Sequence, residues 1–159
     1  MKTILFAFGL TLAAPITQAA ELAVDYPEGY RHWAHVKTLI LEPGHPLYSA
    51  FGGLHHIYAN PAALKGYNSG TFPDGAVIVF DLLEVNQGDH AIAEGPRKIV
   101  GVMQRDQRRF ADTGGWGFEG FVKGDPTQRA VGDQAKGACF GCHLEQAGEK
   151  GFVFSTWRE

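Results

Sequence analysis

The sequence AVIVFDLLEV, residues 76–85, decides the fold of this 159-residue chain. Successive side chains of a β-strand point to opposite faces, so the two faces of this segment can be compared. One face carries Ile78, Phe80 and Leu82, and the other carries Val77, Val79, Asp81 and Leu83. Both faces are largely apolar, which is typical of a strand in the interior of a sheet. We therefore predict a strand here that other elements cover on both sides.

Further apolar runs flank this segment, and turn sequences separate them. The runs are HVKTLIL (35–41), GLHHIYA (53–59), RKIVGVMQ (97–104) and GFEGFVKG (117–124). The segments between the runs contain EPGHP, FPDG, NQGD, DTGG and GDP, which favour turns. Short strands that alternate with turns predict a mostly antiparallel sheet of about five strands. The predicted fold class is α+β and mainly β, with short flanking helices.

The predicted helices are short, because the chain contains 21 glycines and 8 prolines, too many for a bundle of long helices. In NPAALKGYNSG (60–70), Asn60 is placed to cap a helix that ends at Gly66 or Gly70. Two more candidates are PEGYRHWAHV (27–36) and PTQRAVGDQAKGACFGCH (126–143). The last of these would form a C-terminal helix or loop that carries the cysteines.

The N-terminus has the pattern of a secretory signal peptide. Lys2 precedes the apolar run ILFAFGLTLAA (4–14), and small and polar residues follow it. This run is shorter than the roughly 20 residues that span a bilayer, so a membrane anchor is disfavoured. Thr17 and Ala19 suit cleavage after residue 19. We expect a signal peptide over 1–19, a single domain over 20–159, and a periplasmic mature protein without a membrane anchor.

The segment GACFGCHLEQ, residues 137–146, holds the 2 cysteines of the chain, Cys139 and Cys142, followed directly by His143. A redox disulfide of the thioredoxin type would lie early in the chain, whereas this motif lies near its end. A structural zinc site would need four ligands and a second pair at matching spacing, which the other histidines do not supply. In an exported protein, C-x-x-C-H favours one covalently attached haem c. Cys139 and Cys142 would form the thioethers, and His143 would be the axial ligand to iron.

The residue on the other side of the iron decides the function. Met103 is the only methionine after the predicted signal peptide, and its apolar surroundings favour a core residue over a ligand. His55 and His56 lie on opposite faces of their predicted strand, so at most one of them points toward the haem. An open iron indicates the binding of small gases. A Met103 or histidine ligand would instead indicate electron transfer with a redox partner protein.

The charge of the chain argues against one class of partner. The formal net charge is −3 and there is no basic patch, so nucleic acid is not an expected partner.

Several features together resemble the cytochrome P-460 family, from roughly Val36 to the end of the chain. They are the N-terminal signal, the β-rich body, FPDGAVIV entering a strand, GGWGFEGF before a helix, and the C-terminal C-x-x-C-H. In the members that oxidise hydroxylamine, a lysine at the end of the FPDG strand is cross-linked to the haem. Phe80 occupies that position here. The resemblance is therefore to the branch without the cross-link, the cytochromes c′-beta, and it implies a methanotroph as the source.

The same resemblance implies that two phenylalanines cap the open side of the iron. Phe80 is one, and Phe51, after the helix-forming PLYSA (46–50), is the other. Periodicity alone favours ordinary core packing for Phe80. An apolar cap admits NO and CO but does not assist oxygen, which profits from a hydrogen-bond donor. We expect NO binding, sequestration or transport by a homodimer, with electron transfer or hydroxylamine oxidation as alternatives.

Overall fold

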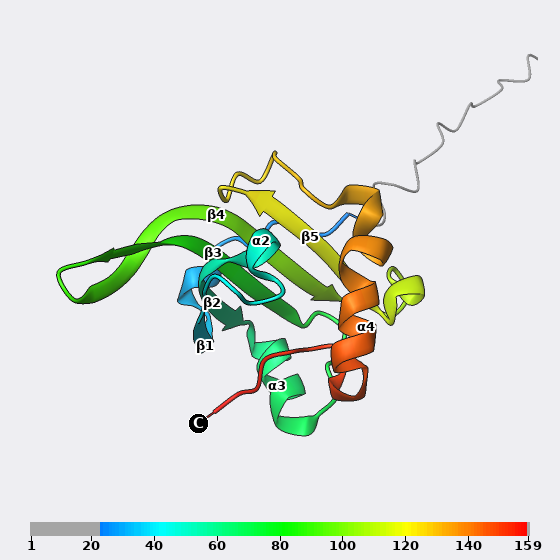
Figure 1. Ribbon diagram of the computed structural model, residues 1–159. Coiled ribbons are helices and arrows are strands. Elements are labelled where there is room, and N and C mark those ends of the chain that lie inside the picture. The colour runs from blue at the N-terminus through cyan, green and yellow to red at the C-terminus, as the bar shows by residue number, and fades with distance from the viewer. Residues whose placement is uncertain (1–22, 159) are drawn as a thin grey trace, which may run out of the picture.

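The computed structural model describes residues 23–158, which form a five-stranded antiparallel sheet with short helices beside it (Figure 1). The signal peptide predicted over 1–19 lies outside the described residues. The strands are β1 (Ala34–Leu41), β2 (Gly53–Ala59), β3 (Val77–Gly88), β4 (Ala91–Arg105) and β5 (Trp116–Val122). They lie in the sheet in sequence order, so each strand pairs with its neighbours in the chain. The predicted fold class, α+β and mainly β, is confirmed.

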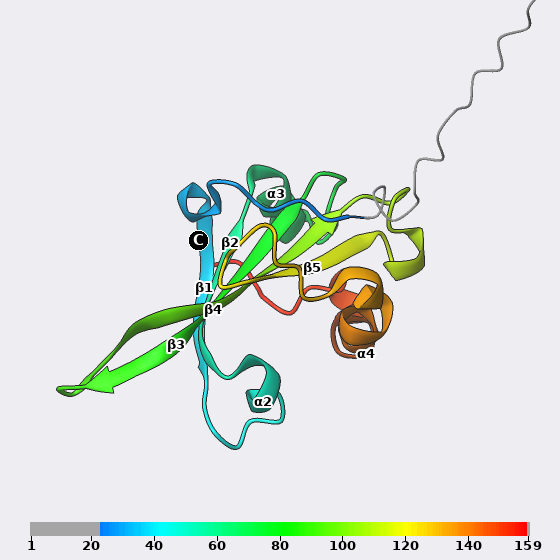
Figure 2. The same cartoon turned by 90° about the horizontal axis from the view of Figure 1, so that it is seen from above.

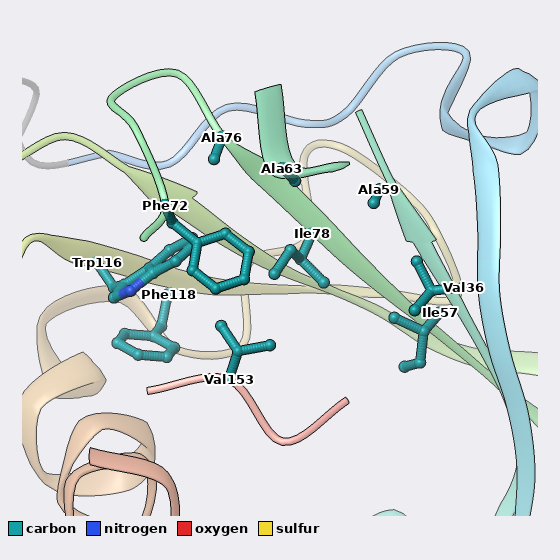
Figure 3. Close-up of a cluster of buried hydrophobic side chains, with 10 residues drawn as sticks. All are labelled: Val36, Ile57, Ala59, Ala63, Phe72, Ala76, Ile78, Trp116, Phe118 and Val153. Carbon is teal, nitrogen blue, oxygen red and sulfur yellow. The ribbon is translucent and has the colours of Figure 1, made fainter. Parts of the chain in front are cut away.

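β3 lies in the middle of the sheet and is covered on both sides, as predicted. Ile78 belongs to a buried cluster that the C-terminal segment covers with Val153 (Figure 3). Val79 belongs to a second cluster, which the N-terminal segment covers with Val24 and Tyr30. We call these two sides of the sheet the C-terminal face and the N-terminal face.

β3 and β4 continue beyond the other strands as a two-stranded ribbon, which projects from the body of the protein (Figure 2). Pairing continues to Gly88 and Ala91, and only Asp89 and His90 lie between them. These two residues have φ values of 49° and 58°, the left-handed pair that closes a two-residue hairpin. The sequence predicts strands that stop at 85 and resume at 97. Both strands are longer than predicted, because this tight turn lets their pairing continue to the end of the ribbon.

In the described part of the chain, three α-helices lie beside the sheet: α2 (Tyr48–Phe51), α3 (Pro61–Ser69) and α4 (Gly141–Ala147). Asn60 caps α3 as predicted, since its side-chain oxygen accepts a hydrogen bond of 2.8 Å from the backbone N–H of Ala63. The helix ends at Gly70, whose φ of 78° is left-handed, and not at Gly66. Among the described residues, no helix is long and apolar enough to cross a membrane.

Two of the predicted helices are shorter than the sequence indicates. Within 27–36 only the 3-10 turn Tyr30–His32 forms, because the Tyr30 side chain is buried and the chain then enters β1. Within 126–143 the helical structure begins with the 3-10 turn Gly132–Gln134. It continues as the π-helical turn Lys136–Phe140, which leads directly into α4.

Asp81 joins the N-terminal segment to the sheet. Its side chain is fully buried on the N-terminal face. The Tyr30 hydroxyl donates to Asp81 Oδ2 at 2.7 Å, and the Arg97 guanidinium donates two hydrogen bonds of 2.7 and 3.1 Å. Burial, together with the hydrogen bond to Asp81, raises the pKa of Tyr30, so the phenol stays protonated as a donor. The buried carboxylate is therefore both paired and hydrogen-bonded, as a buried charge requires.

We expect Asp81→Ala to lower the free energy of unfolding by about 3 kcal/mol, because Tyr30 and Arg97 lose their buried partner. Urea unfolding followed by far-ultraviolet circular dichroism measures this change. Glu94→Ala is the control, since the Glu94 carboxylate is 45% exposed in its pair with His56; its loss should cost less than about 1 kcal/mol. Equal losses in the two variants would contradict the structural role of Asp81.

Candidate haem-binding site

The π-helical turn and α4 carry the cysteine motif over the C-terminal face. Cys139 and Cys142 are free thiols, the first half-buried and the second exposed. Residues three and four apart on a helical segment lie on the same side, so both thiols and His143 share one side of it. Cys139 packs against the buried cluster of the C-terminal face. The motif is thus docked on the sheet through its first cysteine.

The surroundings of Cys139 help to distinguish a redox dithiol, a zinc site and a haem attachment as the role of this motif. Burial, and to a lesser degree the Glu119 carboxylate, raises the pKa of the Cys139 thiol. Reactive redox dithiols need the opposite shift, toward the thiolate. A zinc site is also disfavoured, because residues 23–158 contain no group of three or more His, Cys, Asp or Glu side chains that could hold a metal ion. Within the described residues, these observations argue against a redox dithiol and against a zinc site.

His143 is held in an orientation that suits a metal ligand. Its Nδ1 lies 2.7 Å from the backbone carbonyl oxygen of Phe152. A carbonyl can only accept, so we assign the proton to Nδ1, which leaves the lone pair on Nε2. Burial lowers the pKa of His143 and favours the neutral ring. A neutral imidazole with one nitrogen anchored to a carbonyl is the usual form of a histidine that binds metal.

Aromatic rings flank His143 on two sides. The ring of Phe118, from β5, has its centroid 4.9 Å from the imidazole centroid. The ring of Phe154, from the C-terminal segment, lies at 4.6 Å. The imidazole therefore has little freedom to turn about its Cβ–Cγ bond. The sheet and the last residues of the chain together fix the direction of Nε2.

Phe51 and Phe80, the two residues predicted to form a cap, are in contact. Phe80 is half-buried on β3 and pairs in register with Gly101 of β4. A Cβ atom at Gly101 would lie 2.6 Å from Phe80 Cδ1, so the ring occupies the space above this glycine. Phe51, at the end of α2, is 40% exposed. The two rings meet edge to face with centroids 5.9 Å apart.

His55 is a third member of this group, and its contacts were not predicted. Its buried ring lies 4.7 Å from the ring of Phe80. Its Nε2 lies 2.5 Å from the carbonyl oxygen of Phe51 and donates to it. His56 points to the other face, as predicted, and bonds to Thr38 and Glu94. Strand alternation places His55 on the face of Phe80, but only the register of β2 with β3 shows that they touch.

Met103 lies on the same face of the sheet as Phe80. It pairs in register with Ile78 on one side and with Phe118 on the other. Its half-buried side chain packs against the buried cluster of the C-terminal face. This packing agrees with the prediction of a core residue. Met103 is also on the face that the cysteine motif covers.

Large apolar side chains remain exposed beside this face. Five of the six that the described chain exposes lie in two segments, residues 47–51 and 144–154: Leu47, Tyr48, Phe51, Leu144 and Phe154. Figure 2 shows α2 and α4, which belong to these segments, projecting from the same side of the sheet. Exposed apolar side chains gathered in this way mark a binding site. The two thiols and the anchored imidazole belong to the same face of the sheet, and together with these apolar side chains they fit a haem.

One protein family, described as cytochrome P-460, matches this chain over residues 27–155. The chain belongs to the cytochrome P-460 family. A cytochrome P-460 protein is a haem c cytochrome, so the chain binds haem. The match spans all five strands, α4 and each of the five predicted site residues. A search of curated proteins finds no match for this cytochrome P-460 protein.

We expect the double variant Cys139→Ala, Cys142→Ala to release its haem into acidified organic solvent, because no thioether would remain. The absorbance of the organic phase, compared with that of the aqueous phase, measures the release. The parent protein is the control and should keep the colour in the aqueous phase. Haem that stays with the double variant would mean that the attachment lies elsewhere in the chain.

Proposed function

We propose that this protein is a periplasmic mono-haem c-type cytochrome whose five-coordinate iron binds NO and CO. Its role is NO binding, with sequestration or transport of the gas. Cys139 and Cys142 hold the haem, and His143 is the axial ligand. The observation that carries the proposal is the edge-to-face pair of Phe51 and Phe80 on the face of the sheet where Phe118 contacts His143.

His143 would supply the protein's ligand to the iron. When bound, the haem provides an iron with one coordination position open to a small molecule. The Phe152 carbonyl keeps the proton on Nδ1 and directs Nε2 away from it. Phe118 and Phe154 restrict rotation of the imidazole. The ligand is therefore positioned before the cofactor arrives, and its proton does not need to move.

On the other side, Phe51 and Phe80 supply apolar surface and no hydrogen-bond donor. The Phe51 and Phe80 rings exclude water and carry no polar atom. His55 lies next to them, but its Nε2–H already donates to the Phe51 carbonyl. Dioxygen carries partial negative charge when it binds and needs such a donor, whereas NO and CO depend on one far less. A pocket that offers no donor would therefore favour NO and CO over dioxygen. This preference supports gas binding and argues against oxygen activation.

Hydroxylamine oxidation is disfavoured by the residue at position 80. The cross-linking lysine of that branch of the family corresponds to Phe80, which has no amine to form the bond. Lys98 is a nearby amine, but its Nζ donates to the Gly52 carbonyl at 2.7 Å. Both residues support a binding protein over this enzyme.

Export and dimer formation are part of the proposal. The predicted signal peptide supports a periplasmic location. A homodimer packed through the sheet is supported by β1, an edge strand whose outer side has no partner strand among the described residues. Exposed strand edges are sites of further pairing. Sedimentation velocity of the haem-loaded protein tests the dimer, and a monomer at micromolar concentration would refute it.

We expect the resting ferric protein to show a high-spin, five-coordinate spectrum that Met103→Leu leaves unchanged, because Met103 packs in the core. Visible absorption and electron paramagnetic resonance measure the spin state. A six-coordinate low-spin spectrum that disappears in Met103→Leu would favour the electron-transfer function. A green, far-red-shifted chromophore would favour hydroxylamine oxidation.

We expect Phe51→Val and Phe80→Val each to bind CO about tenfold faster than the parent, a barrier lower by ~1.4 kcal/mol. The smaller side chains relieve the steric cost of bringing a ligand to the iron. Stopped-flow mixing of CO with the ferrous protein measures the rate. Ile92→Val is the control, since Ile92 is exposed on the ribbon. Parent rates in both folded valine variants would show that these rings are ordinary core.

A further inference from the structure

We propose that His55 and Lys98 position Phe51, by holding a lid segment, residues 42–52, over the site through its backbone carbonyls. Opening of this lid then controls how fast a ligand reaches the iron and leaves it. The inference rests on the proposed function, because it assumes that Phe51 faces the open side of the haem.

The lid segment is attached to the sheet only weakly by packing. It connects the end of β1 to the start of β2, and every residue from 42 to 51 is exposed. Its internal hydrogen bonds form one compact turn, with Phe51 N–H donating to Leu47 O at 2.9 Å and Gly52 N–H to Tyr48 O at 2.7 Å. In Figure 2 the segment with α2 stands out from the sheet. It can therefore move as a unit.

Space for this movement exists on the side of the ribbon. A surface hollow of about 410 Å³ separates the lid segment from the base of the ribbon. Tyr48 and Gly52 line it from the lid segment, and Val85 and Ile92 line it from the ribbon. The lid segment thus borders open space on this side.

Two side chains of the sheet bond to the C-terminal end of the lid. His55 of β2 donates through Nε2 to the Phe51 carbonyl at 2.5 Å. Lys98 of β4 donates through Nζ to the Gly52 carbonyl at 2.7 Å. Consecutive carbonyls are therefore held from two different strands. The position of the Phe51 ring follows from both bonds.

A hinge lies directly after these carbonyls. Gly53 has a φ of 132°, a conformation that other residues rarely adopt. It also begins β2, where its backbone is paired with Leu41. Rotation at Gly52 would swing Phe51 while Gly53 stays paired in the strand. The lid would then turn about a fixed point in the sheet.

His55 contacts both residues of the cap, the ring of Phe80 and the backbone carbonyl of Phe51. Its imidazole packs against Phe80 at 4.7 Å while its N–H holds the Phe51 carbonyl. Burial lowers the pKa of His55, which favours the neutral ring. His55 thus fixes the position of Phe51 relative to Phe80. Lys98 acts from the outside, since its side chain is exposed.

The test measures CO association and dissociation on the ferrous, haem-loaded protein in variants that remove one donor each. His55→Leu and Lys98→Met should raise both rates by roughly three- to tenfold, the range for the loss of one hydrogen bond. The affinity for CO should change less than about twofold, because a lid affects arrival and departure alike. His55→Gln and Lys98→Arg, which restore a donor, should return the rates toward those of the parent.

A second measurement reports on the lid itself. Hydrogen exchange of the amides in residues 42–52, followed by mass spectrometry, should be faster in Lys98→Met than in the parent. Because Lys98 is exposed, this variant is expected to fold. The matched control is His56→Leu, a histidine on the same strand that points to the other face. It should leave both the CO rates and the exchange of 42–52 unchanged.

The outcomes distinguish failure of the lid proposal from failure of the proposed function. If Phe80→Val binds CO faster but neither His55→Leu nor Lys98→Met changes the rates or the exchange, the lid proposal is wrong and the apolar cap stands. If no variant in the cap or the lid changes the rates, the cap itself is misplaced. A low-spin resting spectrum that His55→Leu converts to high spin would make His55 an iron ligand and overturn the lid.

Discussion

The alternation of side chains along β3 constrains both the core and the site. Asp81 must point to the N-terminal face, because Tyr30 and Arg97 satisfy its buried carboxylate there. Its neighbour Phe80 must then point to the C-terminal face, where Phe51 and His55 meet it. A slip of one residue in the pairing would exchange the two and bury an aromatic ring where the charge belongs. The polar cluster on one face therefore fixes the apolar site on the other.

The C-terminal segment completes the site from the opposite end of the chain. The Phe152 carbonyl orients His143, and Val153 closes the buried cluster beneath it. A haem bound here would rest between side chains from β2, β3, β5 and the last helix. In the proposed site, His143 would hold the haem through its anchored, neutral imidazole, and Phe51 and Phe80 would supply apolar surface. We propose that this combination suits the binding of a small neutral ligand.

Much of this arrangement could be predicted from the sequence, and the exceptions have physical causes. All five strands and the Asn60 cap follow from local patterns, because alternation and capping depend on neighbouring residues. The short turn at Tyr30–His32 does not, since a buried tyrosine hydroxyl overrides the local helix signal. The extended ribbon depends on left-handed Asp89 and His90, which no strand pattern indicates. The contacts of His55 depend on strand register, and the pairing of Phe51 with Phe80 came only from family resemblance.

The order of strands in the sheet also bears on how the protein acquires its cofactor. Each strand pairs with the one made just before it, so few long loops must close during folding. The β3–β4 hairpin, closed by two residues, has the smallest loop and is expected to form first; pulse-labelled hydrogen exchange showing earlier protection of β1 would contradict this order. The cysteine motif follows β5 in the chain. A chain that folds in this sequence completes its sheet before the cysteine motif, which comes last, docks on the sheet.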